Sequence, residues 1–129
     1  MEVELTNLCM IYQNDLILVQ NRTKSDWPGL TFPGGHVEKN EDEITAIKRE
    51  IREETGLTLL DVEKCGFIEW YNPKTFHRDL CLIYRSNQFE GELSSSKEGE
   101  VFFIKKDELS KFNFSIDFDK ILEICFKGL

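Results

Sequence analysis

The sequence predicts a single domain of the α/β (α+β) class over residues 1–129, with two strands, a helix, three strands and a second helix in chain order. Three observations predict this fold. A glycine turn leads into a helical pattern over Gly35–Leu57, strand-forming segments stand on both sides of it, and an apolar helical pattern follows at Ile116–Phe126. A chain of 129 residues is long enough to bury one core of moderate size.

Two strands are expected before the helix, at Val3–Tyr12 and Leu16–Gln20, and the turn-forming pair Asn14-Asp15 between them predicts a hairpin. A second hairpin is expected from strands within Leu57–Trp70 and at Phe76–Tyr84. The remaining expected elements are a buried strand at Val101–Ile104, a short helix beginning at Lys106–Leu109 and the C-terminal helix at Ile116–Phe126.

Composition excludes several classes of function. The net charge of −8 disfavours sequence-independent binding of DNA or RNA, because such binding depends on a basic surface. No apolar run approaches the length of a membrane span, and the N-terminus lacks the basic and apolar regions of a secretory signal. We therefore expect a cytoplasmic protein that binds neither a nucleic acid polymer nor a membrane.

The cysteines are scattered along the chain, form no CxxC pair and are accompanied by only two histidines, so no zinc-ligand spacing is present. Cys9, Cys65 and Cys81 lie in strand-like segments, and Cys125 lies in the last helix. We expect all of them to be reduced structural thiols.

The central helix should span about four turns. Asn40 is the expected N-cap, with Glu43 closing a capping box, and Gly56 is the expected left-handed stop. The stripe expected to face the core consists of Ile44, Ile47 and Ile51.

A neighbouring stripe of this helix carries Glu50, Glu53 and Glu54. Carboxylates spaced i, i+3 and i+4 repel one another, and Arg49 can reach Glu53 but cannot neutralise all three. Hard divalent cations bind oxygen clusters of this kind. The alternative is a solvated acidic helix face.

The full spacing of this segment resembles the Nudix box. It reads Gly35, five residues, Glu41, seven residues, Arg49-Glu50, an aliphatic, any residue, Glu53-Glu54, any residue, Gly56 and an aliphatic. The resemblance implies the Nudix fold, a mixed β-sheet sandwiched between helices, in which this loop-helix-loop motif holds Mg²⁺ against a diphosphate. The order of the expected elements fits that architecture over the whole chain.

The resemblance also implies roles for individual residues. The metal ligands would be Gly35, Glu50, Glu53, Glu54 and Glu98, with Mg²⁺ as the expected ion and Mn²⁺ as a substitute. The catalytic set would be Glu53, Glu50, Glu98 and Arg49, in which Arg49 orients Glu53. Glu98 is placed like the extra glutamate that MutT-like members bring from the loop before the last strand; Glu100 and a merely solvated carboxylate are the alternatives.

The expected substrate-binding residues are less constrained. Asn7 either faces solvent or points into a pocket and hydrogen-bonds a base. Arg22 follows the second strand, where MutT-like members carry an arginine near the phosphates, or is a surface charge. His36 contacts phosphate or supports the loop. Phe32 and Gly34 complete the set.

The implied activity is Mg²⁺-dependent hydrolysis of a nucleoside triphosphate, with 8-oxo-dGTP the leading substrate, to the monophosphate and pyrophosphate. Trp70 and Tyr71 either stack a base or, as we favour, pack in the core or within the hairpin. The alternatives are hydrolysis of ADP-ribose or a dinucleoside polyphosphate, or a non-catalytic nucleotide sensor. We expect a nucleotide substrate as the partner and a monomer or homodimer.

Overall fold

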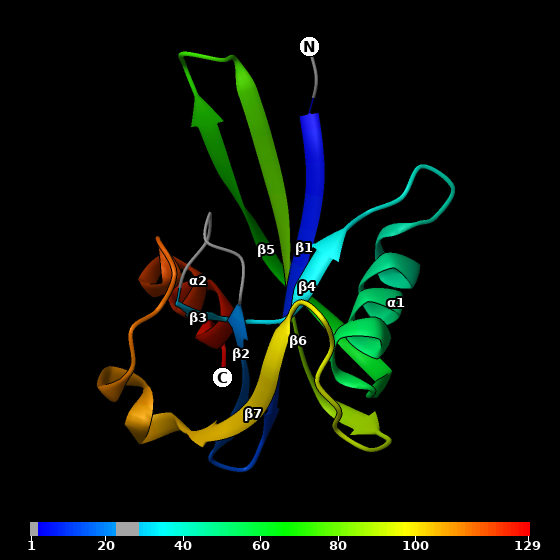
Figure 1. Ribbon diagram of the computed structural model, residues 1–129, viewed down its shortest axis with the longest axis vertical. Coiled ribbons are helices and arrows are strands. Elements are labelled where there is room, and N and C mark those ends of the chain that lie inside the picture. Colours follow the sequence, from blue (N-terminus) through cyan, green and yellow to red (C-terminus); the bar gives the residue numbers. More distant parts are fainter. Residues whose placement is uncertain (1–2, 23–28) are drawn as a thin grey trace.

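The structure is a computed structural model that describes residues 3–22 and 29–129 (Figure 1). A mixed sheet carries helix α1 on one side and helix α2 on the other, as the sequence predicts. The elements in chain order are β1 (Val3–Gln13), β2 (Leu16–Arg22), β3 (Leu30–Thr31), β4 (Gly34–His36), α1 (Glu43–Thr55), β5 (Thr58–Asn72), β6 (His77–Glu90), β7 (Gly99–Lys105), the 3-10 helix η1 (Lys106–Lys111) and α2 (Phe118–Phe126).

Strand β1 is the centre of the sheet, whose order is β3-β2-β1-β6-β5. It runs parallel to β6 and antiparallel to β2 and β4, and β7 pairs with β2. Both expected hairpins are present, and the β5–β6 hairpin extends beside β1 (Figure 1). The sequence did not indicate β3 and β4, because two or three residues are too few for an alternating pattern.

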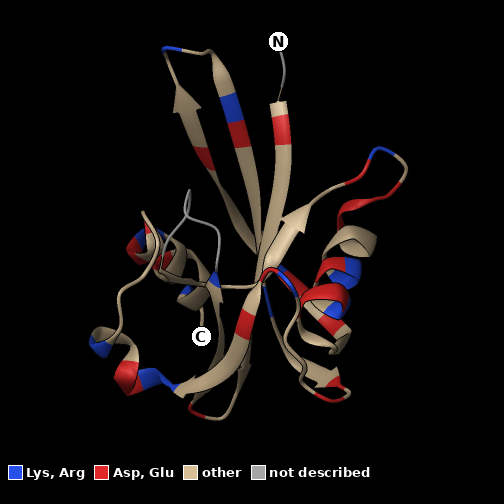
Figure 2. Cartoon of the chain, viewed as in Figure 1, with Lys and Arg blue, Asp and Glu red and all other residues tan. Residues whose placement is uncertain are grey.

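Helix α1 ends as predicted but begins differently. Gly56 adopts the left-handed conformation with φ of 79° and donates its N–H to the Arg52 carbonyl. The predicted N-cap Asn40 is wrong: the cap is Asp42, whose Oδ1 accepts the Thr45 N–H at 2.8 Å. Both residue types favour this position, so composition alone does not distinguish them. Figure 2 shows the acidic positions along α1 and the loop before it.

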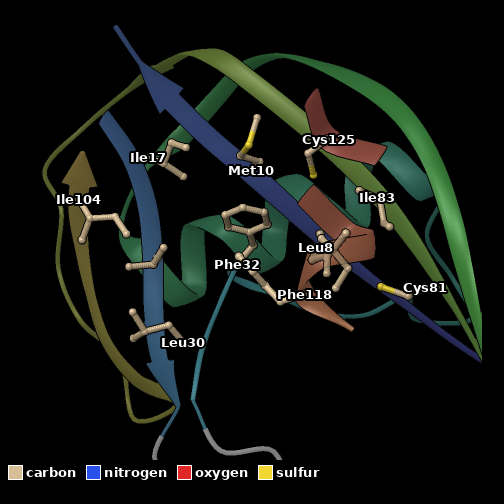
Figure 3. Close-up of a cluster of buried hydrophobic side chains, with 12 residues drawn as sticks. Leu8, Met10, Ile17, Leu30, Phe32, Cys81, Ile83, Ile104, Phe118 and Cys125 are labelled. Carbon is tan, nitrogen blue, oxygen red and sulfur yellow. The ribbon is translucent and has the colours of Figure 1, made fainter. Parts of the chain in front are cut away.

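Two apolar clusters cover the faces of the sheet. Alternation along β1 supplies both, because Leu8 and Met10 point to one face and Cys9 and Ile11 to the other. The first cluster contains Phe118, Ile121 and Cys125 around α2 and is drawn in Figure 3. The second contains Ile47 and Ile51 of α1. The sheet is thereby fixed between the two helices.

One residue of the predicted core stripe on α1 is misplaced. Ile47 and Ile51 are fully buried, whereas Ile44 is 39% exposed. The buried face of the helix includes Glu50 and Glu54, so it is centred to one side of the aliphatic stripe. Ile44 therefore lies at its edge, in the first turn.

Substitutions at these isoleucines should have unequal effects on stability. We expect Ile47→Ala to lower the free energy of unfolding by about 3 kcal/mol, because it leaves a cavity in a closed core. Ile44→Ala should lower it by less than about 1 kcal/mol, since much of that side chain is already solvated. Urea unfolding followed by circular dichroism measures both. Equal losses would contradict the assignment of the core face.

The C-terminal elements follow the prediction with one shift of boundary. The short helix is present as η1, but α2 begins at Phe118 rather than Ile116. Asp117 adopts a left-handed conformation with φ of 61°, and Ile116 is largely exposed, so the helix cannot extend to it. No helix among residues 3–22 and 29–129 is long and apolar enough to cross a membrane.

The cysteines are free thiols, as predicted. Cys9, Cys81 and Cys125 are buried, and Cys65 is partly buried. Burial raises the pKa of the Cys125 thiol to about 12, so it stays protonated at neutral pH. These thiols are packing residues.

Candidate active site

A cavity of about 450 Å³ opens beside α1, β1 and β4, and the sequence-predicted site residues converge on it. Among its lining residues are all of those predictions except Arg49: Asn7, Arg22, Phe32, Gly34, Gly35, His36, Glu50, Glu53, Glu54 and Glu98. Residues from five segments of the chain therefore meet in one place.

The glutamates of α1 form one wall of this cavity. Glu50 and Glu54 are buried, whereas the Glu53 side chain is 58% exposed. Two donors hold Glu54 from other elements: Gln20 Nε2 donates to its Oε2 at 2.8 Å, and Ser96 Oγ donates to the same oxygen at 3.0 Å. Burial raises the pKa of Glu54 above its ordinary value, and its negative neighbours raise it further.

Glycine at position 35 allows Glu50 to approach the β4 backbone. A Cβ on Gly35 would lie 2.7 Å from Glu50 Oε1 and would overlap Oε2. The Gly35 N–H donates to Asn7 Oδ1 at 2.9 Å, which ties this turn to β1. The Glu50 carboxylate therefore fills the space that any other residue at position 35 would occupy.

Arg49 connects the loop and the helix around the cavity. Its Nε and Nη2 donate to the two carboxylate oxygens of Glu41 at 3.0 and 2.7 Å. Its Nη1 donates to Glu50 at 2.8 Å and to Glu53 at 3.1 Å, and Nη2 also donates to the His36 carbonyl at 2.9 Å. Hydrogen bonding to Glu41 raises the pKa of Arg49, so its charge is permanent. The predicted contact with Glu53 is confirmed.

Asn7 points into the cavity rather than to solvent. Its side chain is buried and its Oδ1 accepts the Gly35 N–H, which orients the amide. Nδ2 is then a buried donor that has no hydrogen-bond partner among the described residues. A donor of this kind favours a ligand that presents an acceptor.

The other polar predictions lie at the edge of the cavity. Arg22 ends β2 and is partly buried. Glu98 lines the cavity, and its N–H donates to Ser96 Oγ at 3.1 Å. Glu100, in contrast, is an exposed residue of β7 opposite Asn21. Of these two glutamates, Glu98 is therefore the one that brings a carboxylate to the cavity.

The cavity also has an apolar part, which we call the apolar wall. Its lining residues include Leu8, Phe32, Trp70 and Ile121. Trp70 packs against the α2 core and donates its indole N–H to Asp117 at 2.8 Å, so it combines packing with exposure to the cavity. Tyr71 is exposed, and the Arg78 guanidinium lies over its ring.

Sequence reasoning missed several residues of the cavity. Gln20 is a polar residue that directly follows the apolar run Leu16–Val19 of β2. This change from apolar to polar could have indicated a residue that faces a pocket. Glu4, Thr6 and Asp79 gave no such indication, because they reach the cavity only through the pairing of β1 with β6.

Comparison with known families shows which family the chain belongs to. The NUDIX domain model matches residues 5–123. The chain belongs to the Nudix hydrolase family. An 8-oxo-dGTP diphosphatase from Buchnera aphidicola subsp. Schizaphis graminum is 31% identical over 107 residues, which cover 81% of this chain and 78% of the relative. The chain is thus an enzyme of a family that acts on nucleotide substrates.

Solved structures of MutT proteins share the fold. A MutT Nudix hydrolase from Burkholderia pseudomallei superposes with a TM-score of 0.84 at 20% identity, covering 95% of this chain and 98% of that one. The MutT protein from Bacillus halodurans superposes with a TM-score of 0.79 at 23% identity, covering 94% and 79%. The mixed α+β Nudix fold expected from the sequence is confirmed.

Nudix hydrolases generally use divalent metals, and the donor set here fits one. Glu50, Glu53, Glu54 and Glu98 supply carboxylates to one cavity, and hard cations prefer oxygen ligands. The Gly35 backbone lies against the Glu50 carboxylate, so the β4 turn reaches the same wall. The acidity around α1 in Figure 2 favours a cation at this wall.

Proposed function

We propose that this Nudix hydrolase converts a nucleoside triphosphate, with 8-oxo-dGTP as the preferred substrate, into the monophosphate and pyrophosphate. The observation that carries the proposal is the meeting of the glutamate wall and a separate apolar wall in one cavity. The first wall suits metal-bound phosphates, and the second suits a base. The similarity to the Buchnera 8-oxo-dGTP diphosphatase supports this substrate class.

The metal would be held by Glu50, Glu53, Glu54, Glu98 and the Gly35 carbonyl. When bound, Mg²⁺, or Mn²⁺ in its place, neutralises the phosphates and lowers the pKa of an attacking water. Arg49 fixes Glu50 and Glu53 through its hydrogen bonds to both. It acts as a positioning residue rather than as a proton acceptor.

Proton transfer and phosphate binding fall to side chains at the edge of the cavity. Glu53 Oε2 accepts from Arg49, which leaves Oε1 as the atom we assign to receive a proton from water; Glu98 is the alternative acceptor. Arg22 at the end of β2 supplies positive charge for the phosphates. His36 also lines the cavity, where the phosphates would enter.

The apolar wall and Asn7 would recognise the base. Trp70, which is partly exposed, offers an apolar surface for a planar ring, and Phe32 and Ile121, both 2% exposed, line the same cavity. Asn7 Nδ2 would donate to a carbonyl, a group that 8-oxoguanine carries twice. We assign this reaction to nucleotide-pool sanitation in the cytoplasm by a monomer or homodimer of one domain.

A nucleotide panel tests the proposal. Pyrophosphate and phosphate release would be measured with Mg²⁺ and with Mn²⁺ on 8-oxo-dGTP, dGTP, the other nucleoside triphosphates, ADP-ribose and a diadenosine polyphosphate. We expect kcat/KM for 8-oxo-dGTP to exceed that for dGTP by about tenfold or more, because one additional hydrogen bond of ~1.4 kcal/mol in the transition state corresponds to a tenfold change in rate. Turnover of ADP-ribose or dinucleotides alone would overturn the substrate, and binding without any turnover would favour a nucleotide sensor.

A further inference from the structure

We propose that Glu4, His77 and Asp79 form a second metal site, separate from the glutamate cluster, for a divalent transition-metal ion such as Zn²⁺. One ligand atom from each residue lies within 4.8 Å of the other two. The proposal does not rest on the proposed substrate, because it concerns other side chains and another class of ion.

The spacing of the ligand atoms fits a small ion. Glu4 Oε2 lies 3.1 Å from His77 Nε2, and His77 Nε2 lies 3.4 Å from Asp79 Oδ1. Zinc bonds to nitrogen and oxygen of about 2.0–2.1 Å place neighbouring ligands of a tetrahedral ion about 3.3 Å apart. The two distances to His77 are already close to that separation, and Glu4 and Asp79 lie within 4.8 Å of each other.

Asp79 supplies an independent observation. Its Oδ1 atom is buried and accepts no hydrogen bond among the described residues, and its approach to His77 is only an ion-pair contact. Its partner across the parallel ladder is the Glu4 carboxylate. Two carboxylates placed together in this way favour a cation between them.

The pairing of three strands builds this cluster. Glu4 of β1 stands opposite Asp79 of β6 in the parallel ladder, and His77 lies two residues before Asp79 on the same face. His36 of β4 pairs with Thr6 and contacts the other oxygen of the Glu4 carboxylate, so it stands beside the cluster without belonging to it. Both histidines of the chain therefore meet at one carboxylate.

The donor types distinguish this site from the glutamate cluster. Imidazole nitrogen combined with carboxylate oxygen suits zinc and its neighbours in the first transition series. Mg²⁺ prefers oxygen ligands alone and belongs with the glutamates of α1. Because Glu4 and Asp79 also line the cavity, an ion held there lies at the wall of the nucleotide site.

Histidine NMR tests the proposal directly, because the chain has only two histidines. Protein labelled with ¹⁵N would be saturated with Mg²⁺ to fill the glutamate cluster and then titrated with Zn²⁺. The imidazole signals would be assigned with His77→Gln and His36→Gln. We expect Zn²⁺ to shift the ring nitrogens of His77, and Mg²⁺ to leave them unchanged.

A matched pair of variants then tests the carboxylate. We expect Asp79→Asn to weaken Zn²⁺ binding, read from the His77 signals, by about tenfold or more. Asp119→Asn, on the exposed surface of α2, should leave it unchanged. Circular dichroism would verify that both variants fold. The proposal is overturned if Zn²⁺ leaves His77 unshifted, or if both variants bind Zn²⁺ with the same affinity.

Discussion

Replacing Glu53 with Gln is expected to lower kcat by about 10³-fold, because the amide removes both a negative metal ligand and the assigned proton acceptor. The fold should survive. Glu53 is exposed, and its side chain accepts a hydrogen bond from Arg49 at 3.1 Å. Exposed ion pairs of this kind contribute about 0–1 kcal/mol.

Steady-state turnover with Mg²⁺, together with urea unfolding, measures the two effects separately. Glu123→Gln is the matched control, since Glu123 is also an exposed helical glutamate but lies on α2, away from the cavity lining. It should retain the parental kcat. If Glu53→Gln turned over within about twofold of the parent, the assignment of Glu53 to the reaction would be wrong.

The second large effect is expected at Gly35. In Gly35→Ala the new methyl group takes the space of the Glu50 carboxylate, which must move away from its hydrogen bond with Arg49. A displacement of about 1 Å in a catalytic group typically lowers the rate by about 10²-fold, and we expect kcat/KM to fall by this amount. The obstacle is the end of a side chain, so the fold can adapt to it.

Gly34→Ala is the informative comparison. A Cβ at that position would lie 2.6 Å from Leu8 Cα and would overlap the Asn7 carbonyl, both of which are backbone. Because backbone in the β1–β4 pair cannot move aside easily, we expect a loss of about 3 kcal/mol in the free energy of unfolding. Urea unfolding and kcat/KM would be measured for both variants. Equal losses of stability would contradict the role we give to Gly35.

The sequence predicted helix α1 well because the information that specifies it is local. Carboxylates at positions i, i+3 and i+4 share a helix face, so Glu50, Glu53 and Glu54 meet at one wall of the cavity. Arg49 reaches Glu53 for the same reason, and Gly56 ends the helix through its own conformational freedom. Nothing distant is required for these features.

Local patterns gave the wrong result where two neighbouring residues suit the same position. Asn40 and Asp42 are both good N-caps, and only the path of the loop makes Asp42 the cap. Ile44 continues the aliphatic stripe, but the way α1 lies on the sheet leaves it at the edge of the buried face. Each outcome depends on how the helix meets its neighbours.

The part of the cavity that lies away from α1 was decided by tertiary structure. The sequence contained Asn7, Gln20 and Asp79 without showing which way they face. The register of β1 with β4 brings Asn7 to Gly35, and β1 with β6 brings Glu4 to Asp79. A shift of one residue in either register would turn these side chains to the opposite face of the sheet. Helix geometry depends on a few consecutive residues, whereas sheet register depends on partner strands that are distant in the sequence.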